Sequence, residues 1–163
     1  MVPLPTIDGA VVRRSAAALE RYGPDFTYGH NAVAKHLSSV ATTAGGVGAA
    51  LVLAQLAPTR KLLLKAFPSP GEGPSEEVRA KSWFKITFVG EGGGKRVVTE
   101  VSGGDPGYGE TSKMLGESGL CLAFDELPET AGQVTTAAAM GDALLARLQG
   151  AGIGIRVIGP QGV

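Results

Sequence analysis

The segment 102–114, SGGDPGYGETSKM, holds the residue types best suited to building a binding site in this chain. It joins an expected strand end to an expected helix start through a glycine-rich turn. A helix N-terminus presents backbone N–H groups without partners and a partial positive charge, and glycine lets a backbone come close to a ligand. The pattern therefore predicts one wall of an anion or substrate site. A rigid strand-to-helix turn with no ligand accounts for the same spacing equally well.

Seven residues are the candidates for substrate binding at this turn. Asp105 and Thr111 are each suited to capping the helix, and Glu110 lies in the first turn, where a carboxylate interacts favourably with the helix dipole. Tyr108 offers a hydroxyl between two glycines, and is equally suited to filling the sheet edge. Arg79 is a weaker candidate, as an anion contact. The full set is Asp105, Gly107, Tyr108, Gly109, Glu110, Thr111 and Arg79.

Two other motifs lack the spacing that their chemistry requires. The run GEGGGK at 90–95 is similar to a phosphate loop, but Val89 stands where the first glycine is needed and Arg96 where Ser or Thr is needed. A dinucleotide fingerprint opens a helix, whereas this run opens a strand, so a hairpin turn is the better interpretation. His30 and His36 do not share a helical face, and no acidic residue or cysteine nearby completes a metal set.

The cysteine count, the net charge and the length limit the class of protein. Cys121 is the single cysteine, so we expect a reducing, cytoplasmic compartment and an inert buried thiol. The 15 basic and 15 acidic side chains cancel, and no basic run is interleaved with aromatic residues, so we expect no nucleic-acid partner. A chain of 163 residues suits one domain, 1–163.

The first half of the chain is expected to be helical. Asp8 is a suitable N-cap for a helix over 9–22, which Gly23 and Pro24 would end. A second helix is expected over 31–57, with a possible break at Gly45–Gly46, and Pro58 should interrupt it before a short amphipathic piece over 59–67. The run 68–77, rich in proline and glycine, predicts a loop.

The second half predicts a small sheet and two further helices. Alternating apolar residues indicate strands at 81–89 and 95–101, joined by the glycines of 90–94. Helices are expected at 110–124 and 136–149, followed by a strand at 153–158. This order predicts an α+β fold, with an antiparallel or mixed sheet, the hairpin 81–101 plus the strand 153–158, packed with several helices.

The stretch 37–67 has three interpretations that the sequence leaves open. Residues 37–59 carry no charged side chain, yet Ser, Thr and Gly dominate the first half, so a helix buried in the core or packed on a partner is favoured over a membrane span. The following TRKLLLKAF mixes three basic residues with Leu and Phe. An ordinary amphipathic helix ranks first there, ahead of one that rests on a membrane surface or covers an acyl-chain tunnel.

Three segments resemble one known family: IDGAVVRRSAAALERYGPDFTYGH (7–30), GPSEEVRAKSWFKITFVGEG (73–92) and VSGGDPGYGETSKMLGESGLCLAFDELPETAGQVTTAAAMGDALLARLQ (101–149). The pattern is similar to the C-terminal half of saccharopine dehydrogenase-like oxidoreductases, in particular the trans-acting enoyl reductases of actinobacteria. The DPGYGET–KM and AAAMGDALLARL segments are its most specific parts. One departure is that Thr135-Thr136 stands where the family usually has Thr-Pro, which should alter helix entry slightly.

The resemblance implies a nucleotide-binding Rossmann domain before this region, yet the chain contains no G-x-G-x-x-G segment. It thus implies the substrate-binding and subunit-contact half of an NAD(P)H-dependent reductase that acts on lipid or polyketide-type acyl chains. The chain would be either a fragment or the product of a gene that has lost the Rossmann domain. NAD(P)H is implied only for a full-length member. No cofactor or metal is expected in this chain, which alone should be redox-inactive.

The implied partners are a second copy of the chain or a separate Rossmann-containing chain, together with an acyl or lipid ligand or a membrane surface. The chain would then be cytoplasmic and peripheral to the membrane at most. An alternative hypothesis is a non-enzymatic module that binds lipid or a partner. A further alternative is a cofactor-free cyclase or isomerase that pairs Glu110 with Tyr108 or Asp105 for proton transfer.

Overall fold

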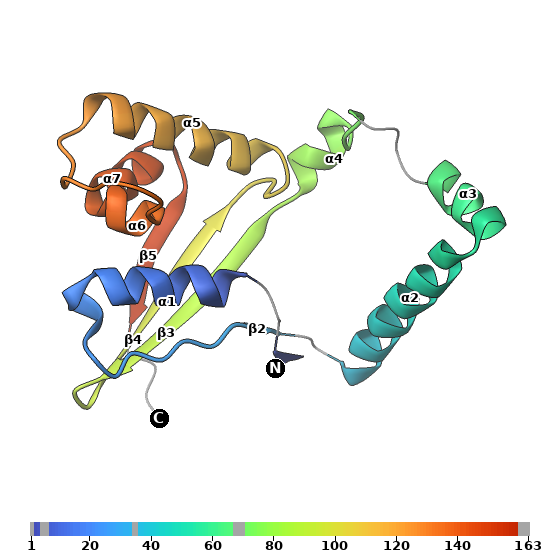
Figure 1. Ribbon diagram of the computed structural model, residues 1–163, viewed down its shortest axis with the longest axis horizontal. Helices are drawn as coiled ribbons and strands as arrows, with labels where there is room; N and C mark the ends of the chain where they lie inside the picture. The colour runs from blue at the N-terminus through green and yellow to red at the C-terminus, as the bar shows by residue number, and fades with distance from the viewer. Residues whose placement is uncertain (1, 4–6, 34–35, 67–70, 160–163) are drawn as a thin grey trace. The chain divides into compact units, whose positions relative to one another are not determined.

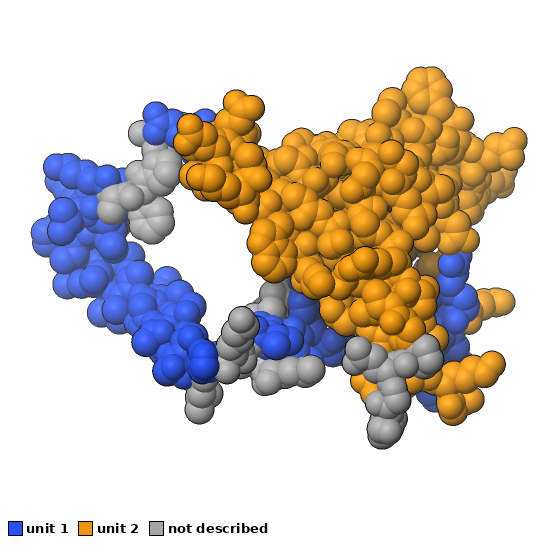
Figure 2. Space-filling view, turned by 180° about the vertical axis from the view of Figure 1, so that it is seen from behind, with its two compact units in different colours: residues 1–16, 21–73 blue, residues 17–20, 74–163 orange. Residues whose placement is uncertain are grey.

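The computed structural model describes residues 2–3, 7–33, 36–66 and 71–159. The chain divides into two compact units, 1–16 with 21–73 and 17–20 with 74–163, which Figure 2 colours separately. Within the described residues the fold is α+β, as expected, with seven α-helices and one three-stranded antiparallel sheet (Figure 1). All three strands of that sheet belong to the second unit, and so does the candidate site.

The first helix is shorter than expected. α1 spans Asp8–Ala18 and begins at Asp8 itself, and a 3-10 turn, Glu20–Tyr22, follows it. Gly23 then adopts φ +73, a left-handed conformation that glycine adopts without strain. The expected helix over 9–22 therefore ends in tighter 3-10 geometry, as helix ends often do. Two short strands, β1 (Val2–Pro3) and β2 (Asn31–Ala32), pair antiparallel.

The apolar middle segment forms two helices joined at Leu56. α2 spans Leu37–Gln55 and α3 spans Ala57–Ala66. The expected helical start at residue 31 is wrong, because residues 31–32 form β2. The expected break at Gly45–Gly46 is also wrong, since α2 runs through both glycines; their cost of about 1 kcal/mol each does not outweigh the surrounding helix. The interruption before Pro58 is confirmed at Leu56, whose backbone is extended. No described helix is long and apolar enough to cross a membrane.

The run 68–77 is only partly a loop. Residues 68–70 lie outside the described residues, and α4 (Glu76–Lys81) begins before the expected loop ends. The Ser75 hydroxyl accepts a hydrogen bond from the Val78 backbone N–H at 3.4 Å, and two glutamates occupy the first turn. The cap and these acidic residues favour helix here. Residues 81–83 are consequently not part of the strand that was expected to begin at residue 81.

The sheet is a hairpin with one added strand. β3 (Phe84–Gly92) pairs antiparallel with β4 (Lys95–Gly103), and β4 pairs antiparallel with β5 (Gly154–Gly159). The two-residue turn is Gly93–Gly94, with φ +56 and +72. Two consecutive positive φ values are the geometry of a type I′ turn, which requires residues such as glycine. The register places Phe84 opposite Gly103, at the far end of the hairpin from the turn.

The remaining helices are α5 (Gly109–Phe124), α6 (Thr136–Ala139) and α7 (Gly141–Gly150). The expected single helix over 136–149 is interrupted, because Met140 leaves helical geometry and Gly141 adopts φ +45. Met140 is nevertheless buried, and so are Val98, Cys121 and Ile153. These four residues are the buried apolar side chains among the described residues: Val98 lies on β4 and Cys121 on α5, whereas Met140 lies between α6 and α7 and Ile153 directly precedes β5.

Candidate active site

The candidate site begins with the close approach of three elements around Gly103. A Cβ atom at Gly103 would lie 2.7 Å from Cε1 of Phe84 and 3.3 Å from Cγ of Glu110. Real side chains do not tolerate the first of these distances, so the end of β4 needs glycine to pack against β3 and the start of α5. The chain then turns through residues 104–108 into α5.

The carboxylate of Asp105 occupies the N-terminus of α5. Its Oδ2 accepts hydrogen bonds from the backbone N–H of Tyr108 at 2.8 Å and of Gly109 at 2.9 Å. The pKa of Asp105 is lowered, chiefly by the Gly109 and Tyr108 backbone hydrogen bonds, with smaller contributions from the Gly107 amide and the charge of Arg79. The Asp105 carboxylate therefore closes the start of α5 from three residues before Tyr108, the N-cap residue. The helix N-terminus, expected to be open to an anion, already holds the chain's own negative charge.

Glu110 holds the turn together from inside it. Its Oε1 accepts a hydrogen bond from the Gly104 backbone N–H at 3.2 Å, and Lys113 Nζ lies 2.6 Å from its Oε2. Only 12% of the Glu110 side chain is exposed. A Cβ at Gly104 would lie 3.1 Å from Glu110 Oε1, so this arrangement also depends on a residue without a side chain.

Thr111 does not cap the helix. Its hydroxyl donates to the Pro106 carbonyl oxygen at 2.5 Å, and the neighbouring Ser112 hydroxyl donates to the Tyr108 carbonyl. Both hydroxyls therefore bond to the backbone of the turn and of the first helical residues. The turn is a rigid platform in which the polar side chains of Asp105, Glu110 and Thr111 all engage the protein itself.

An open hollow of about 490 Å³ lies against this platform. Its lining comes from residues 81–83, residues 105–108 and Pro74. Trp83 and Tyr108 are its aromatic members, and they are 72% and 49% exposed. Asp105, Gly107 and Tyr108 are the sequence-predicted residues that line the hollow. The hollow thus combines an aromatic surface with a short polar edge, as small-molecule sites do.

The other candidates lie beside the hollow. Gly109 and Glu110 begin α5, and Thr111 follows them, so these three shape the platform beneath it. Arg79 acts on Asp105 through its charge, and it does not line the hollow. Lys81, the last residue of α4, is the basic side chain that lines the hollow.

Sequence reasoning missed Trp83, Lys81 and Pro74. The signal that places them is the hairpin register: in an antiparallel pair, the start of β3 lies beside the end of β4. Phe84 is opposite Gly103, so the residues just before β3 must lie near those just after β4. Trp83 directly precedes Phe84, and Asp105 follows Gly103 by two residues.

A buried carboxylate lies elsewhere in the sheet. Glu100, on the central strand β4, is 4% exposed. Lys85 Nζ lies 2.7 Å from its Oε2, and the Arg156 guanidinium donates to its Oε1 at 2.5 and 3.0 Å. These two partners, Lys85 first, lower the pKa of Glu100. The trio ties the three strands together and is structural, because each oxygen of Glu100 is matched by a cation.

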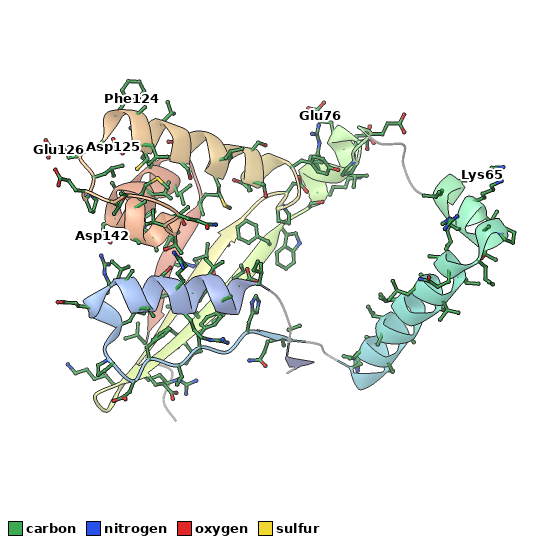
Figure 3. The ribbon with its side chains drawn as sticks, viewed as in Figure 1. Lys65, Glu76, Phe124, Asp125, Glu126 and Asp142 are labelled. Atoms are coloured by element: carbon green, nitrogen blue, oxygen red, sulfur yellow. The ribbon has the colours of Figure 1, made fainter. Side chains whose placement is uncertain are left out.

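A second charged cluster joins α5 to α7. Arg147 donates to both carboxylate oxygens of Asp125, at 2.5 and 2.8 Å, and to Glu117 at 3.3 Å. Asp125 follows the last residue of α5, as Figure 3 shows. The two carboxylates, Asp125 first, raise the pKa of Arg147. Cys121, fully buried beside this cluster, has its pKa raised by burial and then by Asp125, which disfavours the nucleophilic thiolate.

The two histidines do not take part in a metal site among the described residues. His30 Nδ1 lies 3.5 Å from Asp8 Oδ2, and His36 precedes the first residue of α2. In the described parts of the chain, no three His, Cys, Asp or Glu side chains gather as metal ligands would.

Comparison with known proteins identifies the class of relative. A protein of Mycobacterium tuberculosis, provisionally named a trans-acting enoyl reductase, is 39% identical over 162 residues, covering 90% of this chain and 38% of the relative. A trans-acting enoyl reductase of Mycobacterium ulcerans is 37% identical over 155 residues, covering 88% of this chain and 37% of the relative. One of Mycobacterium bovis is 36% identical over the same length.

The chain is therefore homologous to a part of trans-acting enoyl reductases. It spans well under half the length of these curated relatives. No family model matches the chain. No solved structure matches it either.

Proposed function

We propose that this chain is the substrate-facing part of a reductase of the trans-acting enoyl reductase type, and that the hollow beside Trp83 and Tyr108 receives an acyl substrate. The observation that carries the proposal is the pairing of two exposed aromatic side chains with a platform whose polar groups are already bonded. Such a surface gains by covering apolar area and offers few donors to an anion. The partial-length homology supports the reductase class.

The start of α5 offers little support for binding the diphosphate of a nicotinamide nucleotide. The N-terminus of α5 is the helix start that the glycine-rich turn exposes, and the Asp105 carboxylate takes its Tyr108 and Gly109 amides. A diphosphate there would meet a fixed negative charge instead of open donors. The proposal accordingly assigns NAD(P)H to another part of a longer protein or to a separate Rossmann-containing chain, and this chain alone to substrate binding and subunit contact.

The geometry gives less support to a cofactor-free isomerase or cyclase. Such an enzyme needs a carboxylate or phenol free to exchange a proton with a ligand. Asp105 and Glu110 each accept hydrogen bonds from backbone amides of the turn, and Glu110 also lies against Lys113. Those contacts commit both carboxylates to holding the loop in shape.

Trp83 provides a direct test, because it is the single tryptophan of the sequence. A long-chain enoyl thioester titrated into the full chain should change the Trp83 emission with a midpoint in the micromolar range. NADPH, titrated separately by calorimetry, should show no micromolar binding. A flat tryptophan signal together with no calorimetric heat from the thioester would contradict the substrate role.

Two variants test whether the thioester binds at the hollow. Tyr108→Ala should weaken thioester binding about tenfold, since it removes one aromatic wall. Leu115→Ala is the matched control, because Leu115 is exposed on α5 and does not line the hollow, and it should bind as the parent does. Equal loss in both variants would show that the ligand binds elsewhere. Binding of fatty acid with no preference for the thioester would favour the alternative, a lipid-binding module without a role in reduction.

A further inference from the structure

The α2–α3 segment is apolar on its exterior. Among the described residues of α2, α3 and the Leu56 joint, seven aliphatic side chains are exposed: Val47, Leu51, Val52, Leu53, Leu56, Leu62 and Leu64. Leu51, Val52 and Leu53 are consecutive, so in a helix they point in three directions about 100° apart. The C-terminal half of α2 thus exposes aliphatic side chains over a wide arc, with Gln55 as a polar residue at its end. A wide exposed apolar face is stabilised by contact with an apolar layer.

The charge of the same segment is entirely positive. Residues 36–66 contain no Asp or Glu, and the basic side chains Arg60, Lys61 and Lys65 all lie on α3. Figure 3 shows Lys65 extending from the last turn of α3. A helix that mixes leucines with lysine and arginine beside an uncharged apolar helix is the composition of an element that lies in the interface of an anionic bilayer.

The joint between the helices is held by hydrogen bonds. The Thr59 hydroxyl donates to the carbonyl oxygens of Leu53 and Leu56, and the Arg60 backbone N–H donates to the Leu56 carbonyl at 2.9 Å. These bonds satisfy carbonyl groups that the end of α2 would otherwise expose. Satisfied backbone groups are a requirement for a corner that enters a layer with little water.

We propose that α2 and α3 dock on the surface of an anionic lipid membrane, with their aliphatic side chains in the acyl boundary and Arg60, Lys61 and Lys65 at the headgroups. Docking in the plane fits the length. The apolar stretch 45–54 is about 15 Å long as a helix, shorter than the hydrocarbon core of about 30 Å. The N-terminal half of α2 carries Ser38, Ser39, Thr42 and Thr43, which suit the headgroup layer.

A second copy of the chain is the less suitable occupant. A symmetric dimer through this face would bring six cations into one interface, with no acidic residue in the segment to pair with them. An anionic membrane supplies the missing charge over the whole face. A dimer that forms through another surface of the chain is compatible with the proposal.

Vesicle flotation of the full chain tests the proposal, because aggregated protein sinks and bound protein rises. The probes are vesicles of phosphatidylcholine alone and vesicles containing 30% phosphatidylglycerol. We expect binding to the anionic vesicles, weaker binding to the neutral ones, and loss of the difference in high salt. Protein that sinks with anionic vesicles, or floats equally with both kinds, would overturn the proposal.

Two pairs of variants then assign the binding to this face. Lys61→Gln with Lys65→Gln should weaken anionic-vesicle binding about 25-fold, whereas Arg13→Gln with Lys95→Gln, the same change in charge on exposed residues, should not. Leu62→Gln with Leu64→Gln should weaken it at least about tenfold, whereas Leu115→Gln with Val157→Gln, at equally exposed positions, should not. These comparisons use exposed side chains, so folding is preserved.

Two results would reject the membrane surface in favour of another partner. The first is parent-like flotation of both α3 variants. The second is a dimer in sedimentation equilibrium without lipid that the Leu62→Gln, Leu64→Gln variant dissociates, because the face would then be covered by a second copy of the chain.

Discussion

Asp105 Oδ2 lies 2.8 Å from the backbone nitrogen of Tyr108, so a side chain of this protein fills the place where a helix N-terminus would meet an anion. The glycine-rich turn that looks in sequence like a cradle is, in three dimensions, a closed cap. This relationship shifts attention from the helix end to the aromatic hollow next to it. It also gives the Asp105 carboxylate, beside that of Glu110, a part in the stability of the turn.

Acid should weaken the protein through Asp105. Its pKa is lowered below the ordinary value of 3.8, so the ionised carboxylate contributes stability above about pH 4 and loses it as the pH falls through the folded-state pKa. Asp105→Asn should therefore lower the thermal midpoint by several degrees at pH 7 and by much less near pH 2.5. Thermal unfolding of both proteins across this range measures the difference. Glu129→Gln, on an exposed loop, is the control, and a difference for Asp105→Asn that is constant with pH would refute the prediction.

Gly103 should not accept even one methyl group. Gly103→Ala would place Cβ 2.7 Å from the Phe84 ring, and forcing such contacts costs about 1–3 kcal/mol. Chemical denaturation measures the free energy of unfolding. Gly116→Ala, at a helical glycine with nothing within 4 Å of the new Cβ, should instead be neutral or stabilising. Recovery of stability in Gly103→Ala combined with Phe84→Leu would confirm the steric cause, and no recovery would exclude it.

Cys121 should be unreactive in the folded protein. Burial and Asp125 raise its pKa above the ordinary value of 9.0, and only the thiolate attacks a disulfide reagent. The single thiol should react with such a reagent about 100-fold more slowly in the native chain than in denaturant. Arg147→Met, which removes the clamp on Asp125 and Glu117, should speed the native reaction by allowing α5 and α7 to separate more often. A fast native reaction in the parent protein would refute the assignment.

Proline at position 136 should be accepted. Thr136 is the first residue of α6, where a backbone N–H has no partner within the helix, and Thr135 has φ −81 and ψ +157, which suits a residue before proline. Thr136→Pro should raise the free energy of unfolding by about 0.5 kcal/mol by restricting the unfolded chain. Thr136→Ala separates this effect from loss of the hydroxyl. Destabilisation by Thr136→Pro would show that the helix entry differs from this geometry.

The sheet was predictable because its signals are local. Apolar residues alternate along β3 and β4, and two glycines mark the turn between them. The interruption between α6 and α7 was not, since Met140 is apolar and continues the helical pattern while Gly141 takes a left-handed conformation. Leu115 and Leu122, two apolar side chains of α5, are 75% and 61% exposed. Helical periodicity predicts a face, and the tertiary packing determines how wide that face is.

The candidate site, like the fold, was only partly predictable from the sequence. The turn at 103–109 was predictable, because glycine content and the following helix are visible in one window of sequence. The hollow was not, because it needs Trp83, twenty-two residues before Asp105, and the hairpin register brings the two together. The closing of the helix end by Asp105 depends on backbone angles within the turn. Sequence alone leaves Asp105 and Thr111 as equivalent caps.

The cap also sets a rule for ligand selection. Asp105 is tethered three residues from the amide it binds, so it competes with any dissolved anion at the high effective concentration of an intramolecular ligand. We therefore expect phosphate and carboxylate metabolites to bind weakly at this helix end at their ordinary concentrations. Under the proposed function, the neighbouring aromatic hollow takes molecules that gain their affinity from surface contact, and selection between the two kinds of ligand needs no moving part.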